Sequence, residues 1–153
     1  MNQGAWIRVH ERVAGKAEQP TRENIRGVSV AVQISPYDQP QAFRGFYIPE
    51  RGVFRIEFKY LDEELGELQP ADKMVSLELG KYSRKLLAIE VAVDQHNVKV
   101  VELQLVNSVL QRADETVKHL QTRESRPNAR LNYRAVDEVL QQGKANPGAL
   151  VSA

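Results

Sequence analysis

Histidine is the side chain most often used as a general acid, a general base or a metal ligand, and this sequence has three. His10 lies near the N-terminus, and His96 lies two residues after Asp94 in a predicted turn. His119 follows Glu115 by one turn of a predicted helix. A site built on these histidines would require the fold to gather residues that are far apart in the sequence. We therefore interpret them as solvated surface residues.

Two stretches resemble parts of known catalytic motifs, and each lacks a required residue. HERVA, residues 10–14, begins like a zinc-protease helix but has Ala14 where the second histidine ligand would lie. LGKYS, residues 79–83, resembles the end of a phosphate-binding loop, but Val75 stands where that loop needs its first glycine. Neither GxSxG nor GxGxxG occurs. These absences predict no catalytic residue, no metal and no cofactor.

Carboxylates are densest in one stretch: Asp62, Glu63, Glu64, Glu67 and Asp72. Their spacing does not match an EF-hand, in which the ligands alternate around a required glycine. We interpret this stretch as a solvated loop.

A basic stretch follows the first predicted helix and supplies the candidate anion-binding residues Arg123, Arg126, Arg130 and Arg134. Guanidinium groups present paired donors to phosphate oxygens, so phosphate or nucleic acid could dock there. The whole chain is nearly neutral, with 21 Lys and Arg against 20 Asp and Glu, which argues against nucleic-acid binding. We expect the acidic and basic stretches to attract each other, within a subunit or between two.

The composition is typical of one domain with a real core, because the chain has 153 residues of which 42% are hydrophobic. It contains no cysteine, which excludes disulfides and thiolate metal sites. No apolar run reaches the roughly 20 residues of a membrane helix, and the N-terminus lacks the apolar core of a signal peptide. We expect a cytoplasmic protein that does not enter the membrane.

Alternating apolar and polar residues predict strands between residues 27 and 106. In residues 28–34 every second residue is valine or isoleucine, and Phe54, Ile56, Phe58 and Tyr60 share one parity of VFRIEFKY, residues 53–60. Further alternating segments lie at residues 42–48, 75–79, 86–93 and 98–106. Residues 1–26 are expected to form an N-terminal arm with one short strand.

Two helices are predicted after the strands, at about residues 108–122 and 133–142. The first has an apolar stripe at helical spacing, formed by Val106, Leu110, Ala113, Val117 and Leu120, with Ser108 opening a capping box. Asn132 is the predicted N-cap of the second helix, and residues 144–153 are expected to form a flexible tail.

The fold class that follows is α+β, with the single domain spanning residues 27–143. Connections too short for crossover helices predict an antiparallel meander of about five to seven strands, open or strongly curved. The first helix should pack on the apolar face of this sheet.

The charged parity of VFRIEFKY carries Arg55, Glu57 and Lys59, and each could find an opposite charge on a neighbouring strand. Glu78 and Glu90 lie on the outer parity of their own segments. The same outer face should hold small apolar residues of the segment LLAIEVAV, residues 86–93. A face of that kind could receive a second copy, so the candidate interface residues are Ala88, Glu90 and Ala92.

Two functions of different classes follow. The favoured hypothesis is a non-enzymatic interaction module or assembly subunit that forms a homo-oligomer, with a further protein partner also compatible. The alternative is a small-molecule-binding protein or enzyme with a pocket between a curved sheet and the C-terminal helix. Its candidate lining residues are Phe43, Phe46, Tyr47, Phe54, Phe58, Tyr82 and His96. Nucleic-acid binding through the basic stretch is a lesser alternative.

Overall fold

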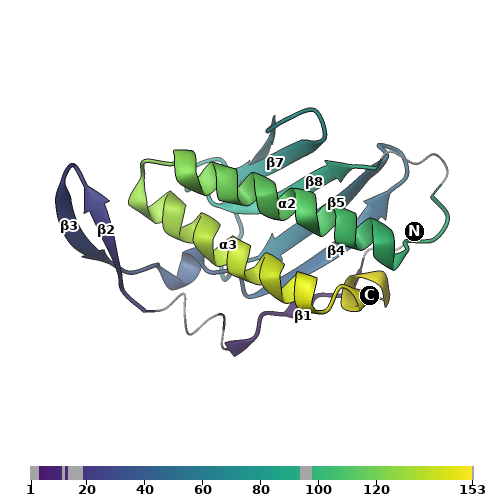
Figure 1. Cartoon of the computed structure of the whole chain (residues 1–153), viewed down its shortest axis with the longest axis horizontal. Helices are drawn as coiled ribbons and strands as arrows, with labels where there is room; N and C mark the ends of the chain where they lie inside the picture. Colours follow the sequence, from purple (N-terminus) through teal and green to yellow (C-terminus); the bar gives the residue numbers. More distant parts are fainter. Residues whose placement is uncertain (1–3, 12, 14–18, 94–97, 153) are drawn as a thin grey trace.

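The protein, as a computed structural model, is described at residues 4–11, 13, 19–93 and 98–152. It is an α+β fold built on an open, antiparallel sheet of six strands in the order β1-β4-β5-β8-β7-β6 (Figure 1). The strands of this sheet are β1 (Ile7–Arg8), β4 (Ala42–Ile48), β5 (Val53–Lys59), β6 (Gly66–Pro70), β7 (Val75–Gly80) and β8 (Leu86–Ala92). The predicted fold class and strand number are confirmed.

The chain places β5 beside β8, so the connection from β5 to β6 passes two strands before the chain returns through β7 to β8. The hairpin β4–β5 and the meander β6–β7–β8 are therefore joined through the β5–β8 pair in the middle of the sheet.

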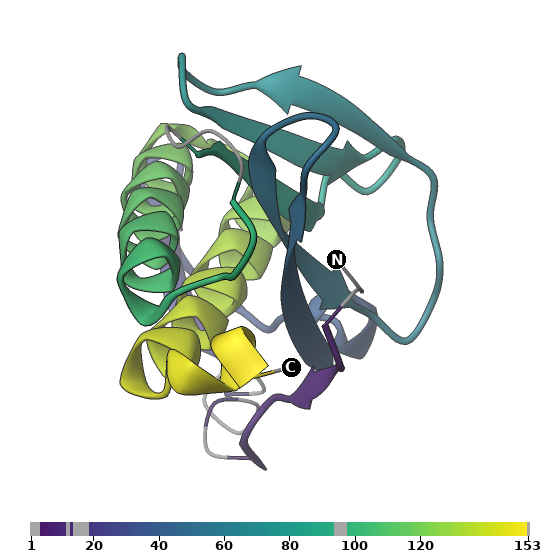
Figure 2. The ribbon, with the colours of Figure 1, turned by 90° about the vertical axis from the view of Figure 1, so that its right-hand side faces the viewer.

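Two long helices, α2 (Leu103–Arg123) and α3 (Pro127–Ala145), cover one face of the sheet (Figure 2). The buried stripe of α2 includes the predicted residues Val106, Leu110, Ala113 and Val117, which pack on the apolar side chains of the central strands. The prediction that the first helix covers the apolar face is confirmed, and α3 lies beside it on the same face. No helix in the described residues is both long and apolar enough to cross a bilayer.

A separate hairpin of two strands, β2 (Thr21–Ile25) and β3 (Val28–Val32), projects beyond the ends of the long helices (Figure 1). The sequence predicted the strand in β3 but assigned it a half-buried face, whereas 61% of Val28 and 37% of Val30 are exposed. The apolar packing of the hairpin is confined to its base, where Val32 and Ile34 contact Leu131 of α3.

The face of the main sheet that lies away from the helices carries a network of ion pairs. Arg55 bonds Glu57 on its own strand, Glu90 of β8 and Glu78 of β7, with nitrogen–oxygen distances of 2.7, 2.8 and 3.2 Å. The network extends through Arg44 to Glu57 and through Arg51 to Glu90, both at 2.7 Å. The predicted pairing of Arg55 and Glu57 with neighbouring strands is confirmed.

Residues 98–106 do not form the predicted strand. The chain from Val98 to Glu102 has no strand pairing, and α2 already begins at Leu103. Val101, Leu103 and Leu105 satisfy an alternating pattern over this short run, but apolar residues at the start of an amphipathic helix produce the same appearance. Ser108, the predicted start of the capping box, accordingly lies inside α2, and the N-cap of α2 is Glu102.

The second helix begins six residues earlier than predicted because Pro127 is its first residue rather than an interruption. Proline is favoured at that position, where its missing N–H would have no partner within the helix. The predicted N-cap, Asn132, is instead buried inside α3, where its side chain bonds the backbone of Leu86 and Asp38. The predicted flexible tail contains a short helix, α4 (Gly148–Ser152), with Leu150 buried in the core.

Candidate functional site

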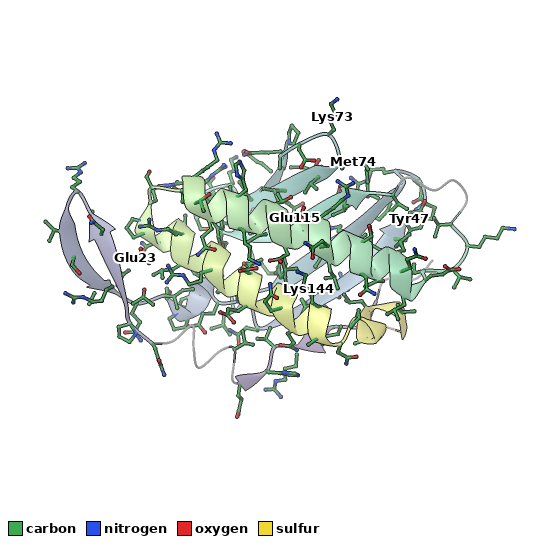
Figure 3. The ribbon with its side chains drawn as sticks, viewed as in Figure 1. Glu23, Tyr47, Lys73, Met74, Glu115 and Lys144 are labelled. Carbon is green, nitrogen blue, oxygen red and sulfur yellow. The ribbon has the colours of Figure 1, made fainter. Side chains whose placement is uncertain are left out.

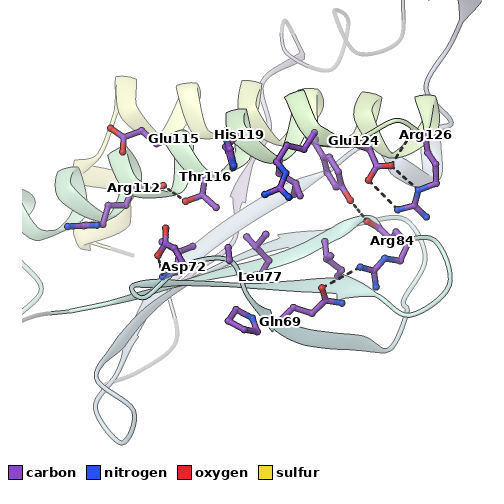
Figure 4. Close-up of a pocket in the computed structure, with 17 residues that line it drawn as sticks. Gln69, Asp72, Leu77, Arg84, Arg112, Glu115, Thr116, His119, Glu124 and Arg126 are labelled. Atoms are coloured by element: carbon purple, nitrogen blue, oxygen red, sulfur yellow. Dashed lines mark hydrogen bonds and ion pairs between the residues drawn. The ribbon is translucent and has the colours of Figure 1, made fainter. Parts of the chain in front are cut away.

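A groove of about 600 Å³ runs between α2 and the outer strands β6 and β7 (Figure 4). It forms because α2 packs over β7 and β8, near the middle of the sheet, while β6 continues beyond the cover of the helix. We call this hollow the helix–sheet groove.

The floor of the helix–sheet groove is apolar. Val75, Leu77 and Leu79 alternate along β7 and face the helices, and Leu120 faces them from α2. Tyr133 of α3 joins the lining, and its hydroxyl donates a hydrogen bond to the backbone oxygen of Arg84 at 3.0 Å.

Polar side chains form the walls. The α2 wall consists of Arg112, Glu115, Thr116, His119 and Arg123, and the sheet wall includes Gln69, Asp72 and Arg84. Glu124 and Arg126, in the connection between α2 and α3, lie at the end of the groove beside Arg84 (Figure 4).

Charge is distributed unevenly along the groove. The end at the C-terminus of α2 has three arginines, Arg84, Arg123 and Arg126, and one carboxylate, Glu124, which leaves two positive charges. At the opposite end Arg112 lies with Asp72 and Glu115, which leaves one negative charge (Figure 4). An apolar floor therefore leads to a positively charged end.

Glu124 already neutralises part of that positive end. It bonds the Arg126 guanidinium at 2.9 and 3.2 Å, and this hydrogen bond, with the charges of Arg126 and Arg84, lowers the pKa of Glu124. Arg123 has no ion pair among the described residues, so its guanidinium is available to an anion that enters the groove.

A second hollow of about 410 Å³ lies along the N-terminal half of α2 and shares Arg112 with the helix–sheet groove. Its lining includes Met74, Val93 and Leu105. The two hollows follow the same side of α2, with Arg112 between them.

The aromatic residues predicted to line a pocket lie elsewhere. Phe43, Tyr47, Phe54 and Phe58 are buried in the main core, and Tyr82 is 81% exposed in the turn before β8. Phe46 lies half-buried on the outer sheet face, with the Arg44 guanidinium 5.5 Å from its ring centre. His96 lies outside the described residues. A pocket exists between sheet and helix, but aliphatic and charged side chains form it.

The residues of the candidate interface are largely covered within one chain. Ala88 has no exposed surface and Glu90 is only 3% exposed, because the surrounding ion pairs cover both residues. Ala92 is half-buried and lies beside the second hollow. Ala88 and Glu90 are therefore part of the interior of one chain.

The four candidate anion-binding arginines divide into two pairs. Arg123 and Arg126 line the helix–sheet groove. Arg130 and Arg134 instead bond Glu23 of the β2–β3 hairpin, at 3.1 and 2.9 Å. Figure 3 shows Glu23 between the hairpin and the helices. Glu23 belongs to the N-terminal arm and not to the acidic stretch. The expected attraction between the basic and acidic stretches is therefore not observed among the described residues of one chain.

The acidic stretch bonds the turn that resembled a phosphate-binding loop. The Glu64 carboxylate accepts the backbone N–H groups of Tyr82 and Ser83, each at 2.8 Å, and the Ser83 hydroxyl. Burial acts to raise the pKa of Glu64, but these hydrogen bonds outweigh it and lower that pKa. The turn does bind an anion, and that anion is a carboxylate of the same chain.

Sequence reasoning missed most of the groove. His119 does line it, but no group of three His, Asp or Glu residues suited to a metal occurs in the described part of the chain. One signal was available: Arg112, Glu115, His119 and Arg123 recur at spacings of three and four residues, which defines a polar stripe beside the apolar stripe of α2. Arg84 and Gln69 gave no comparable signal, because strand pairing brings them to the site.

Comparison with family models, curated proteins and solved structures gives one result. None of them matches the chain.

Proposed function

We propose that this chain is a non-enzymatic binding protein whose helix–sheet groove takes a small amphipathic anion. The apolar body of the ligand would lie on the floor, and its acid group would lie near Arg123 at the C-terminal end of α2. The observation that carries this proposal is the apolar floor leading to an end with two unbalanced positive charges.

The size of the groove supports a small ligand. Its volume of about 600 Å³ lies within the range of roughly 300 to 1,000 Å³ that is typical of small-molecule sites. Such sites combine a mostly apolar lining with a few polar groups that fix orientation, and the leucines of β7 and the arginines at the groove end have those two roles.

The chemistry of the walls supports binding rather than catalysis. The Thr116 hydroxyl donates to the backbone oxygen of Arg112 at 2.8 Å, so it is engaged with its own helix rather than with a base. The His119 ring makes no hydrogen bond with a described side chain in the groove, whereas an activated nucleophile needs a base within hydrogen-bond reach.

The experiment uses two probes, anilinonaphthalene sulfonate and decanoate, with binding followed by fluorescence and by titration calorimetry. Thr116→Trp should fill the groove and abolish binding of both probes. Arg123→Gln should weaken binding about tenfold, because a hydrogen bond to a charged group contributes about 1.5 to 3 kcal/mol. Arg22→Gln is the matched control, since it removes an exposed arginine from the hairpin, outside the groove.

The expected result is one saturable site for which the two probes compete. The affinity for both probes should fall as salt is added. Binding that is unchanged in both groove variants would refute the proposal, as would the absence of saturable binding by the folded wild-type chain.

A further inference from the structure

The edges of the two sheets lie outside the helix–sheet groove and differ in how they are protected. Four strands in the described residues have a free edge: β1 and β6 in the main sheet, and β2 and β3 in the hairpin. Free edges can pair with other chains, and proteins usually protect them with charges, proline or short length.

Three of the four edges are protected in this way. β1 has only two residues, and β6 carries Glu67 and ends at Pro70. β2 carries Arg22 and Glu23. β3 has the sequence VSVAV, with no charge, no proline and no glycine. It is the one unprotected edge in the part of the chain that the structure describes.

The side chains of β3 lack partners over most of its length. Four of its five residues are exposed, and only Val32 at its base is half-buried. Glu23 anchors the neighbouring strand to α3 through Arg130 and Arg134, but no core residue covers Val28 at the tip. A hairpin of two strands is marginally stable alone, so a further strand on β3 would stabilise it.

The turn of the hairpin determines which backbone groups of β3 are free. Ile25 pairs with Val28 across a turn of two residues, and both turn residues have positive φ, 53° at Arg26 and 83° at Gly27. In such a hairpin the residues beside the turn exchange both hydrogen bonds, and bonded and non-bonded pairs then alternate. Ser29 and Ala31 therefore direct their N–H and C=O groups away from β2.

The sequence of β3 is complementary to itself. When two antiparallel copies pair about Val30, Val28 lies opposite Val32 and Ser29 lies opposite Ala31. This register joins the free backbone groups of Ser29 to those of Ala31 in both directions. It also places valine beside valine and small residues beside small residues, with no charge on either strand.

We propose that β3 pairs with β3 of a second copy of this chain, which forms a two-fold symmetric dimer through an intermolecular sheet of four strands. A second copy fits better than a charged partner strand, because a neutral edge offers no charge to recognise and the register is symmetric. Two-fold dimers of this isologous kind are the commonest oligomers. The valine rows of both copies would form one continuous apolar surface on the side of the sheet that faces α3.

The test compares two double variants by analytical ultracentrifugation over a concentration series. Ser29 and Ala31 are both exposed, and their cross-strand neighbours are Asn24 and Arg22, so substitution leaves the packed face of the hairpin unchanged. Ser29→Lys/Ala31→Lys places like charges in both intermolecular pairs. Ser29→Glu/Ala31→Lys, the matched control, places opposite charges in the same pairs.

We expect the wild type and the control to dimerise, with a Kd for the Lys/Lys variant raised about tenfold or more. Mixing the Lys/Lys variant with Ser29→Glu/Ala31→Glu should restore dimers, because each pair then joins opposite charges. Thermal unfolding of each variant at low concentration checks that the monomer is folded.

A wild type that remains monomeric would overturn the proposal. Equal Kd values for the Lys/Lys and Glu/Lys variants would also overturn it, since the interface would then lie elsewhere. Assembly beyond a dimer would indicate pairing of β3 with a different edge and would refute the symmetric register. Probe binding in the groove is a separate measurement, so failure of either proposal leaves the other intact.

Discussion

The substitution Asp137→Asn should stabilise the protein at neutral pH, because two carboxylates meet where α2 and α3 pack together. Asp114 of α2 is almost fully buried and accepts hydrogen bonds from Lys118 and Lys144 at 2.9 and 2.5 Å. Burial, the hydrogen bond to Asp114 and the charge of Asp114 raise the pKa of Asp137 from 3.8 to about 6. Burial acts to raise the pKa of Asp114 as well, but its hydrogen bonds, first that from Asp137, outweigh burial and lower it.

The magnitude follows from linkage between proton binding and folding. Because the pKa of Asp137 is higher in the folded state than in the unfolded state, ionisation of this group opposes folding. The contribution of protonated Asp137 to stability is fully present below pH 3.8 and is lost as the pH rises through about 6. A pKa difference of about 2 between the folded and unfolded states corresponds to about 3 kcal/mol. Because Asp137 is coupled to Asp114, we expect the variant to gain about 1 to 3 kcal/mol in free energy of unfolding. An asparagine amide can donate to Asp114 at every pH, so the variant avoids this loss.

The assay is urea unfolding of the wild type and the variant, from about pH 4.5 to about pH 8. The stability difference should favour Asp137→Asn, grow between about pH 4 and about pH 6, and then remain constant. Glu138→Gln removes the same charge from the next residue of α3, outside the ion pairs of Asp114, and should show no such rise. A difference that does not depend on pH, or one that favours the wild type above pH 6, would refute the reasoning.

Three further substitutions test the packing. Asn132→Ala should cost about 3 kcal/mol in urea unfolding, because the buried N–H of Leu86 would lose its 2.9 Å acceptor. Gly45→Ala should cost about 1 to 3 kcal/mol, since its new Cβ would lie 2.6 Å from the Phe54 ring. Gly143→Ala, inside α3, should instead gain up to about 1 kcal/mol, because its new Cβ would lie 3.4 Å from the nearest side-chain atom, Leu110 Cδ2. Ala88→Arg should unfold the monomer rather than separate a dimer, because Ala88 is fully buried; an intact fold with unchanged stability would contradict this.

The alternating strands and the stripe of α2 could be predicted because each has one face in the core. Phe54, Ile56 and Phe58 are buried on one side of β5, while Arg55 and Glu57 pair on the other. The period of the apolar residues therefore reports directly which side is covered.

The strands that were missed have no such pattern. In β6, GELQP, four of the five residues are exposed, and in β2, TRENI, the one buried residue is Glu23, so backbone pairing determines the structure and the side chains give little signal. A β-bulge explains one further difference, because the register shift between Glu78 and Leu79 pairs Leu86 with Leu79. Leu86 is consequently buried in the core, although it shares its parity along β8 with Glu90, which pairs with arginines on the outer face.

The groove could not be predicted because it depends on where the helix lies relative to the sheet. Arg84 and Arg123 are 39 positions apart in the numbering, and they share a site only because α2 leaves β6 uncovered. The sequence does contain the polar stripe of α2, but that stripe alone does not show whether it faces water or a cavity.

The ion pairs on the outer sheet face have a consequence for how a ligand approaches the molecule. Arg44, Arg51 and Arg55 balance Glu57, Glu78 and Glu90, so this network carries no net charge. An anion in solution would then be drawn mainly toward the arginines near the α2–α3 connection. We expect ionic strength to change the association rate at the groove, while encounters with the balanced network remain nearly insensitive to salt.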